Sequence, residues 1–392
     1  GFLGTTKPDL GFILGSQDSD VRYEAAKLGY LTKYPTFNQS FTQVSTKDLK
    51  LTADMDLFPD FKINLTAART KSSNFSEQYS IDMTADDPYT SLSPYTYGNF
   101  QVSTILIKTS FSKSDVNGSE AFDQFRQNRL IIANRLAEKY YGGTGFARYG
   151  DGGRDTPTGE FATANAGYPV GFGKNNQAVL LPAFLAAYQG QDANDTKTSM
   201  FRDVPLPNWA IKYTGLMRYK FFKERFKRFS VQHGYEASYN INQFRTNYNY
   251  STPEDNTSGG RPLAVHQDNN GAGNFYNKFV ISNVNLAERF NPLVRFDVEM
   301  KNSFKFLAEV KKDRTLNMSF DNNLLTEVKG NDYTLGLGYR IKDVIINSRL
   351  ANNPTNTIKS DVNLKLDVTL RKSLTIVRYL DYDNNQLGGG QD

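Results

Sequence analysis

The clearest alternation of apolar and polar residues lies between Asn208 and Asn242. Two runs of about 13 residues each carry apolar side chains at every second position, and the basic stretch 223–228 joins them. A period of two is typical of a β-strand with one apolar and one polar face. Ordinary strands average about 5–6 residues, whereas a tilted strand needs about 9–11 to cross a bilayer. The pattern therefore predicts a transmembrane hairpin of an outer-membrane barrel.

The same alternation recurs before and after this hairpin. A tight Pro59-Asp60 turn separates two alternating runs and predicts a second hairpin. The run 303–321 keeps one parity throughout, which favours a single long strand over a hairpin that turns at Lys312-Asp313. Weaker strand candidates lie at 77–84 and 100–111, and the pattern predicts roughly 14 strands in total. The clearest other runs are 49–57, 61–67, 293–301, 333–341 and 361–371.

In a membrane barrel, the apolar parity of such strands faces lipid and the polar parity faces the lumen. The predicted lipid-facing residues are Leu49, Leu51, Met55, Leu57, Ile63, Leu65, Val362, Leu364, Leu366, Val368 and Leu370. The predicted lumen-facing residues are Lys50, Asp54, Lys212, Arg218, Lys365 and Asp367. Their charges are of both signs, so such a wall would stay wet without holding cargo by one type of charge.

Residues 113–207 interrupt the alternation. Ser119 is a suitable N-cap for a helix over 120–141, which Gly142 and Gly143 would end. This helix is amphipathic, so it could pack onto the barrel, pack within its own subdomain or bind a membrane surface. A Gly-rich loop follows. The next apolar piece, 178–188, contains Pro182 and is shorter than the roughly 18 residues of a spanning helix.

These features divide the chain into four parts. Residues 1–36 are an irregular lead-in with a short helix at 21–31, and residues 37–112 supply barrel strands. The insertion 113–207 is far longer than an ordinary connection, so we interpret it as a cap, a gate or a lumen subdomain. Residues 208–392 supply further strands. Neither end has the features of a natural terminus, which predicts a segment of a longer protein.

Composition agrees with a barrel and excludes little else. The 392 residues include 28 Phe and 23 Tyr, yet the mean hydropathy is −0.55. Aromatic girdles and a polar lumen produce this combination, although a soluble β-rich protein would resemble it. The net charge of +5 is too small to indicate nucleic acid as a partner. The absence of Cys excludes disulfides and thiolate metal sites.

No residue pattern indicates catalysis, a cofactor or a metal. His233 and His266 lie far apart, and His233 is on the apolar parity of its strand, as expected for a packed imidazole. The Gly-rich GGTGFARYGDGG favours a loop over a phosphate cradle, because no strand of a βαβ unit precedes it. The loop carboxylates Asp18, Asp20, Asp151 and Asp155 lack EF-hand spacing.

The turn 223–228 interleaves basic and aromatic residues. A short turn between long strands belongs at the periplasmic rim of a barrel, where cations can meet lipid phosphates. A plain solvated turn explains the pattern equally well. Binding of nucleic acid is a remote third interpretation.

Four long, irregular stretches resemble the SprA/Sov family of Bacteroidota, which is named for gliding motility and type IX secretion. The stretches are GYPVGFGKNNQAVLLPAFLAAYQG (167–190), DVPLPNWAIKYTGL (203–216), AERFNPLVRFDVEMKN (287–302) and LTEVKGNDYTLGLGYRIKDV (325–344). The resemblance covers most of the chain, which would be a C-terminal portion of a giant outer-membrane protein. It implies one part of a very large single-chain barrel.

The same resemblance implies a function. Members of the family form the translocon that passes folded cargo proteins across the outer membrane. Their implied partners are outer-membrane lipids, a partner barrel at a lateral opening and a periplasmic plug protein. Neither catalytic residues nor cofactors are expected. The rival interpretations are an outer-membrane transporter or porin for small solutes, and a soluble β-rich adhesin.

Overall fold

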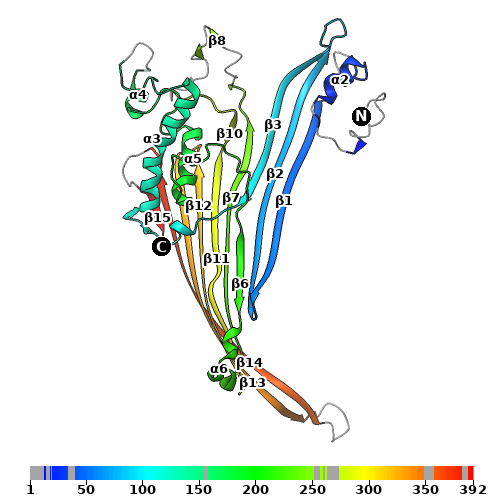
Figure 1. The fold of residues 1–392 in the computed structure, drawn as a ribbon, viewed down its shortest axis with the longest axis vertical. Coiled ribbons are helices and arrows are strands. Elements are labelled where there is room, and N and C mark those ends of the chain that lie inside the picture. The colour runs from blue at the N-terminus through cyan, green and yellow to red at the C-terminus, as the bar shows by residue number, and fades with distance from the viewer. Residues whose placement is uncertain are drawn as a thin grey trace.

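A long, curved antiparallel sheet dominates the computed structural model of the chain (Figure 1). The structure describes residues 13–14, 18, 20–33, 40–152, 158–250, 257–258, 261–262, 273–347, 357–381 and 387–391. Eleven strands form the sheet, in the order β1-β2-β3-β7-β11-β12-β13-β14-β15, with β6 between β2 and β7 and β10 on β7. The all-β fold class is therefore confirmed, and the strand order is an open path rather than a closed ring within the described residues.

The strands are long, as the alternation predicts. Most contain 15 to 24 residues. Their bounds are β1 Ser40–Phe58, β2 Phe61–Ile81, β3 Tyr89–Ser103, β6 Asn208–Tyr213, β7 Phe226–Thr246, β10 Phe279–Ile281, β11 Asn283–Met300, β12 Phe304–Ser319, β13 Leu324–Asn347, β14 Thr357–Tyr379 and β15 Leu387–Gln391. Two small ribbons lie apart from the sheet: β4 Ser114–Asp115 with β5 Gly118–Ser119, and β8 Thr257–Ser258 with β9 Arg261–Pro262.

Several predicted elements are confirmed. The Pro59-Asp60 turn joins β1 to β2, with Asp60 in the left-handed region at φ 72°. The run 303–321 is one strand, β12, with no turn at Lys312. The weaker candidates are confirmed in part, because β2 ends at Ile81 and β3 ends at Ser103. Beyond Ser103 the chain leaves the sheet and forms the 3₁₀ turn η1, Ile107–Thr109.

The predicted hairpin over 208–242 needs one correction. Its second strand, β7, is longer than expected, but its first strand, β6, stops at Tyr213. A 3₁₀ turn, η2 (Gly215–Arg218), and a short helix, α6 (Lys220–Arg225), replace the rest. Tyr213 pairs with Phe61, the first residue of β2, so a longer β6 would find no partner on that side. The N–H of Thr214 donates instead to the Asp60 carbonyl at 2.9 Å.

The register shows that one face of the sheet is continuous. Residues paired across antiparallel strands point to the same side. One such row crosses the sheet from β1 to β14 through Leu49, Arg69, Val102, Tyr239, Leu286, Leu316, Glu327 and Ile376. A second row lies nearer the β11–β12 turn: Val231, Phe296, Ala308, Leu335 and Val368. We call the side that carries both rows the apolar face, and the opposite side the polar face.

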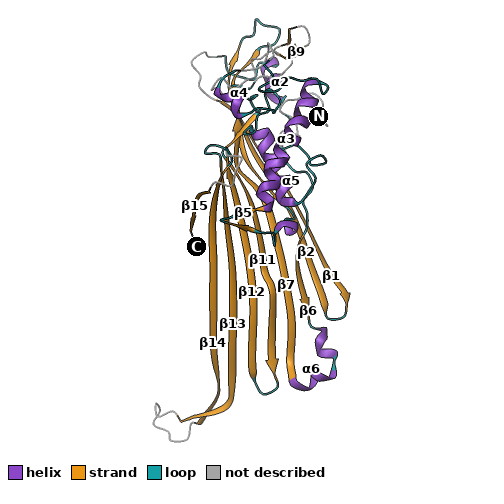
Figure 2. Cartoon of the chain, turned by 90° about the vertical axis from the view of Figure 1, so that its left-hand side faces the viewer, coloured by secondary structure: helices purple, strands orange, loops and turns teal. Residues whose placement is uncertain are grey.

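Two helices of the insertion cover the upper end of the apolar face (Figure 2). The predicted helix over 120–141 is α3, Glu120–Tyr141, which Ser119 caps and Gly142 ends in the left-handed conformation. The apolar piece 178–188 is the core of α5, Gln177–Gln189, which is buried almost all round. A continuous core joins the helices to the sheet, with Phe125 and Phe184 in the same cluster as Tyr239, Leu286 and Leu316. The smaller helices are α2 Val21–Lys27 and α4 Glu160–Ala164.

The two ends of the sheet differ. The tight turns β1–β2 and β11–β12 lie at the lower end, together with α6 (Figure 2). The insertion and its helices lie at the upper end. The upper end also carries the short turn between β12, which ends at Ser319, and β13, which begins at Leu324.

Candidate functional site: the two faces of the sheet

Below the helices, the apolar face is uncovered. The predicted lipid-facing residues lie on this face, except that Leu57 falls at the register shift between Asp56 and Phe58 and is not placed by the pairing. Leu366 and Leu370 are 60% and 68% exposed, although they are as apolar as the core residues above them. Contiguous exposed apolar surface of this kind marks an interface with a partner or with lipid.

Aromatic side chains border this exposed band at its lower end. Phe58, Phe61 and Tyr213 form one cluster, with ring centroids 4.7 Å apart for Phe58 and Phe61. Phe304 and Tyr339 form another pair at 6.3 Å. An aromatic girdle at the edge of an apolar band is typical of strands at a membrane–water interface.

The polar face carries charges of both signs. Lys50, Asp54, Lys212, Lys365 and Asp367 all lie there, as the alternation predicts. Exposed ion pairs connect neighbouring side chains, including Lys365 with Asp367 at 2.7 Å. Such pairs contribute only about 0–1 kcal/mol each, so their main effect is to keep the face hydrated.

Arg218 is the exception among the predicted lumen-facing residues. The alternation predicts the polar face for Arg218 only if the first run continues as a strand through residue 221. The residue lies in η2 instead, and its guanidinium forms an ion pair with Asp60 at 2.6 Å. Strand alternation therefore does not place Arg218 on the polar face.

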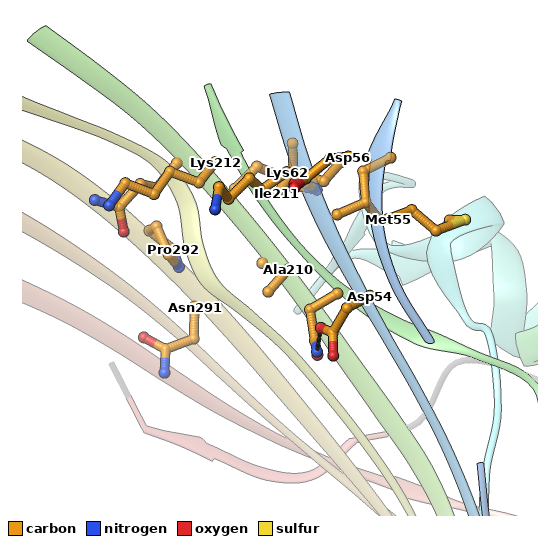
Figure 3. A pocket seen from close by; sticks show the side chains of 14 residues that line it. Asp54, Met55, Asp56, Lys62, Ala210, Ile211, Lys212, Asn291 and Pro292 are labelled. Atoms are coloured by element: carbon orange, nitrogen blue, oxygen red, sulfur yellow. Dashed lines mark hydrogen bonds between the residues drawn. The ribbon is translucent and has the colours of Figure 1, made fainter. Parts of the chain in front are cut away.

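A cleft of about 480 Å³ opens where β6 is inserted between β2 and β7 (Figure 3). The register of β11 shifts here, around Asn291 and Pro292. Polar side chains from β1, β2, β6 and β7 contribute much of its lining: Asp54, Asp56, Lys62, Asn64, Lys212 and Gln232. The mixed charges make this a wet recess without the convergent donors of a ligand site.

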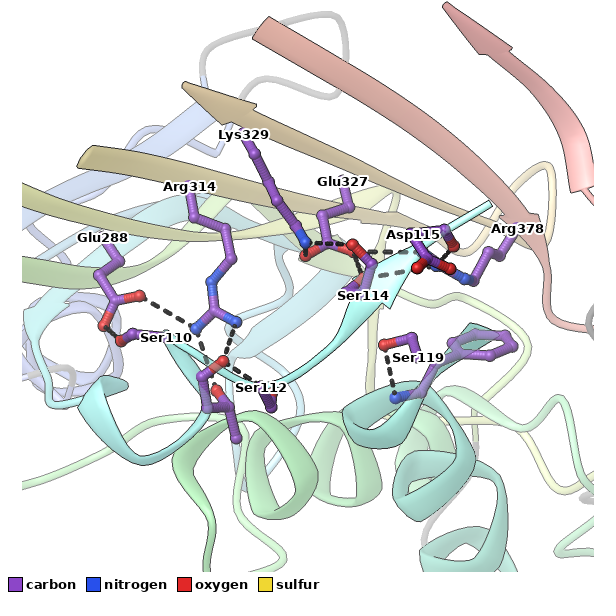
Figure 4. A network of polar contacts seen from close by, with 12 residues as sticks. Ser110, Ser112, Ser114, Asp115, Ser119, Glu288, Arg314, Glu327, Lys329 and Arg378 are labelled. Atoms are coloured by element: carbon purple, nitrogen blue, oxygen red, sulfur yellow. Dashed lines mark hydrogen bonds and ion pairs between the residues drawn. The ribbon is translucent and has the colours of Figure 1, made fainter. Parts of the chain in front are cut away.

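A buried network of charges connects the insertion to the apolar face (Figure 4). On β12, Arg314 pairs with Glu288 of β11 at 3.0 Å, and both side chains are nearly fully buried. The same guanidinium donates to the carbonyl and the hydroxyl of Thr109, at 2.9 and 3.0 Å. Ser110 donates to Glu288 at 2.5 Å. Residues just before the insertion thus supply further hydrogen-bond partners to a buried ion pair on the sheet.

A second pair repeats the arrangement two strands further on, between β13 and β14. Arg378 of β14 and Glu327 of β13 are 3.1 Å apart and are both fully buried. Arg378 also donates to the Asp115 carbonyl at 2.8 Å, and Ser114 donates to Glu327 at 2.5 Å. Residues 109–115 therefore lie against the sheet along a line of charges that separates the covered core from the exposed band.

The helices lie on the opposite side from the predicted lumen-facing side chains. The insertion was interpreted as a cap, a gate or a lumen subdomain. Leu316 and Leu325 pack in one core with its helices, and Glu327 accepts a hydrogen bond from its Ser114. The pairing of β12 with β13 has no register shift from these residues down to the exposed band, so both lie on one face. A lumen constriction would have to lie on the face that lines the lumen. If that is the polar face, α3 and α5 cannot form the constriction, because they pack on the apolar face.

The histidines and loop carboxylates considered from the sequence do not come together in a site among the described residues. The Nδ1 of His233 is 2.7 Å from the Leu293 carbonyl oxygen, and its ring lies near Trp209, as expected for a packed imidazole. Asp151 accepts a hydrogen bond from the N–H of Arg148 within the Gly-rich loop. His266 and Asp155 lie outside the described residues. Among the described residues, no group of three His, Asp or Glu side chains could hold a metal ion.

The charged network was missed at the sequence level, although a signal exists. Glu288, Arg314, Glu327 and Arg378 occupy the apolar parity of their strands, where a membrane-facing position would exclude them. Four charges on an apolar parity indicate that another part of the chain covers those positions.

The fold and the two faces define an all-β protein built on a long-stranded, two-faced antiparallel sheet. No family model and no curated protein matches the chain. In the part of the chain that the structure describes, no helix has the length and apolar character needed to span a membrane.

Proposed function

We propose that the chain forms part of the wall of an outer-membrane protein-conducting channel. The observation that carries the proposal is the exposed apolar band on one face of the sheet, with a mixed-charge polar face directly behind it. If water lay on both sides of the sheet, the apolar side chains of the band would be exposed to water, which is unfavourable. Lipid on one side and an aqueous lumen on the other match both faces at once.

The dimensions support a membrane band. On β14, the apolar positions from Val362 to Leu370 extend over roughly 26 Å along the strand at ~3.3 Å per residue, which a tilt of about 40° would reduce to roughly 20 Å of height. Outer-membrane barrels have an apolar band about 25 Å tall. The strands continue above this band, where the insertion covers their apolar side chains. The insertion would thus shield strand ends that project beyond the bilayer.

The open strand order supports a wide channel. In the hydrocarbon region unpaired strand edges are not tolerated, so further strands must complete the ring beside β1 and β14. Lumen width grows with the number of strands, and a folded cargo protein needs a wide lumen. The resemblance to the SprA/Sov family favours the type IX secretion translocon that serves gliding motility. Its expected partners are cargo proteins, a partner barrel at a lateral opening and a periplasmic plug.

Deletion of the gene tests this function. Secreted proteins should accumulate in the periplasm, and gliding should stop. A transporter or porin for small solutes is the rival, because it would share the two-faced sheet. Normal secretion together with loss of uptake of one solute would establish the rival instead.

A further inference from the structure

The segment that joins β6 to β7 is longer than a tight turn and is rich in aromatic and basic residues. Residues 214–229, which we call the rim segment, include η2, α6 and the start of β7. The rim segment lies at the lower end of the sheet, opposite α3 and α5 (Figure 2). A hairpin at this place needs only a tight turn, as β1–β2 and β11–β12 show. The additional residues are mostly aromatic or basic.

Its aromatic side chains continue the apolar face of the sheet. Phe222 of α6 contacts Phe226 and Phe229 of β7, with ring centroids 5.7 and 5.0 Å apart. Phe229 in turn lies 6.4 Å from Phe296, which is in the exposed band. At the outer end of this series, Phe221 and Tyr219 are 53% and 63% exposed. The apolar surface therefore extends from the strands onto the rim segment.

The rim segment also carries more cations than its neighbours can neutralise. Its basic residues are Arg218, Lys220, Lys223, Arg225, Lys227 and Arg228, and its only acid is Glu224. Carboxylates of the β1–β2 turn and of β11 pair with three of the cations: Asp60 with Arg218, Glu299 with Lys227 and Asp297 with Arg228.

Two cations of α6 stay without a carboxylate. Lys223 and Arg225 form no ion pair with any described residue, and the guanidinium of Arg225 lies 4.3 Å from the centre of the Phe221 ring. The backbone N–H of Lys301, in the next turn, donates to the Arg225 carbonyl at 3.2 Å. The surplus positive charge thus borders the exposed aromatic side chains.

We propose that the rim segment binds the phosphate groups of anionic phospholipids in the leaflet at this end of the sheet. The inference rests on the proposed membrane location. Phe221 and Tyr219 would enter the interfacial layer, and Lys223 and Arg225 would lie at the level of the phosphates. Cations near an anionic membrane surface strengthen binding about fivefold each. The rim segment would fix the height of the channel wall in the bilayer.

Site-specific quenching tests the proposal. The chain contains no Cys, so Tyr219→Cys provides a labelling site within it for a fluorophore. The protein is purified from the membranes of its own cells and reconstituted in phosphatidylcholine nanodiscs. A small fraction of spin-labelled phosphatidylglycerol or spin-labelled phosphatidylcholine serves as the quencher. Phosphatidylglycerol should quench the label more strongly at equal mole fraction.

The variant Lys223→Gln/Arg225→Gln should abolish that preference. The control variant Lys27→Gln/Lys139→Gln removes the same amount of charge from α2 and α3, and it should retain the preference for phosphatidylglycerol. In the unmodified background, 1 M salt should also abolish the preference, because the screening length falls from about 10 Å to 3 Å. Equal quenching by both lipids, or a preference that survives the rim substitutions, would overturn the inference.

A label at Leu366→Cys separates this failure from a failure of the proposed function. Leu366 lies in the exposed band, so a membrane location requires that both lipids quench its label. Quenching at Leu366 with no preference at Tyr219 would reject only lipid binding by the rim segment. No quenching at Leu366 would reject the membrane location itself and the inference with it.

Discussion

At the residue scale, the buried pairs are the positions most sensitive to change. Arg314 and Glu288 are nearly fully buried beside the insertion. Glu288→Gln leaves the guanidinium without a counter-charge, which should cost about 3–5 kcal/mol of unfolding free energy. Breaking the exposed Lys365–Asp367 pair by Lys365→Gln should cost about 0–1 kcal/mol. Urea unfolding of the purified protein measures both, and equal costs would show that the network is not buried.

Adjacent residues of β14 should differ sharply in their tolerance of charge. Leu366→Arg places a cation on the apolar band and should cost about 2–4 kcal/mol near the bilayer midplane. Lys365→Arg on the polar face should be nearly neutral. The yield of folded protein in the outer-membrane fraction reports the difference. Equal tolerance on both parities would contradict the barrel interpretation.

At the element scale, alternation predicted strands well but could not locate every strand end. β12 was recovered because its apolar parity persists from Phe304 to Met318. β6 was overextended because Gly215, Met217, Tyr219 and Phe221 continue the same parity into a turn and a helix. What ends β6 is the β1–β2 turn beside it, and one strand's sequence contains no information about the length of its neighbour.

The insertion illustrates a second limit of the sequence. The cap Ser119 and the stop Gly142 are local signals, so α3 was predictable to the residue. The face on which α3 packs depends on contacts between distant residues such as Phe125 and Leu316. The interpretation of the insertion as a cap, a gate or a lumen subdomain followed from its length, its capped helix and its apolar piece 178–188, and the packing on the apolar face argues for shielding instead.

Shielding and constriction predict different results for Phe184→Ala. Phe184 is fully buried in α5, so the truncation should cost about 3–5 kcal/mol of stability. Single-channel conductance of the folded fraction should stay unchanged, because α5 lies away from the polar face. Leu130→Ala, at an exposed position of α3, is the matched control. A larger conductance for Phe184→Ala would instead support the interpretation of the insertion as a lumen constriction.

The docking of α5 should weaken at alkaline pH. Burial, with a smaller contribution from the Glu327 carboxylate, raises the pKa of Tyr188 above its usual value near 10. A raised folded-state pKa gives a contribution to stability that is complete below about pH 10 and is lost as the pH rises further. Tyr188→Phe should therefore lose less stability between pH 9 and 12 than the unmodified protein. Tyr219→Phe, at an exposed position, should follow the unmodified curve in a circular dichroism titration.

At the scale of the whole molecule, the two faces are the central feature. The alternation assigned Leu366 and Asp367 to opposite faces from the sequence alone, and the register agrees. The structure adds that both faces are accessible in the chain itself, because Leu366 is 60% exposed and the Asp367 side chain is 41% exposed. The sequence alone could not show this. Accessibility to water in the cell therefore depends on what covers the apolar band.

Thiol labelling in intact membranes measures this most directly. The chain has no Cys, so Leu366→Cys and Asp367→Cys each introduce one thiol on neighbouring residues of one strand. A water-soluble maleimide should label Asp367→Cys in the intact outer membrane and should label Leu366→Cys only after lipid is replaced by denaturant. Equal labelling of both variants in intact membranes would show water on both faces and would contradict the channel-wall account.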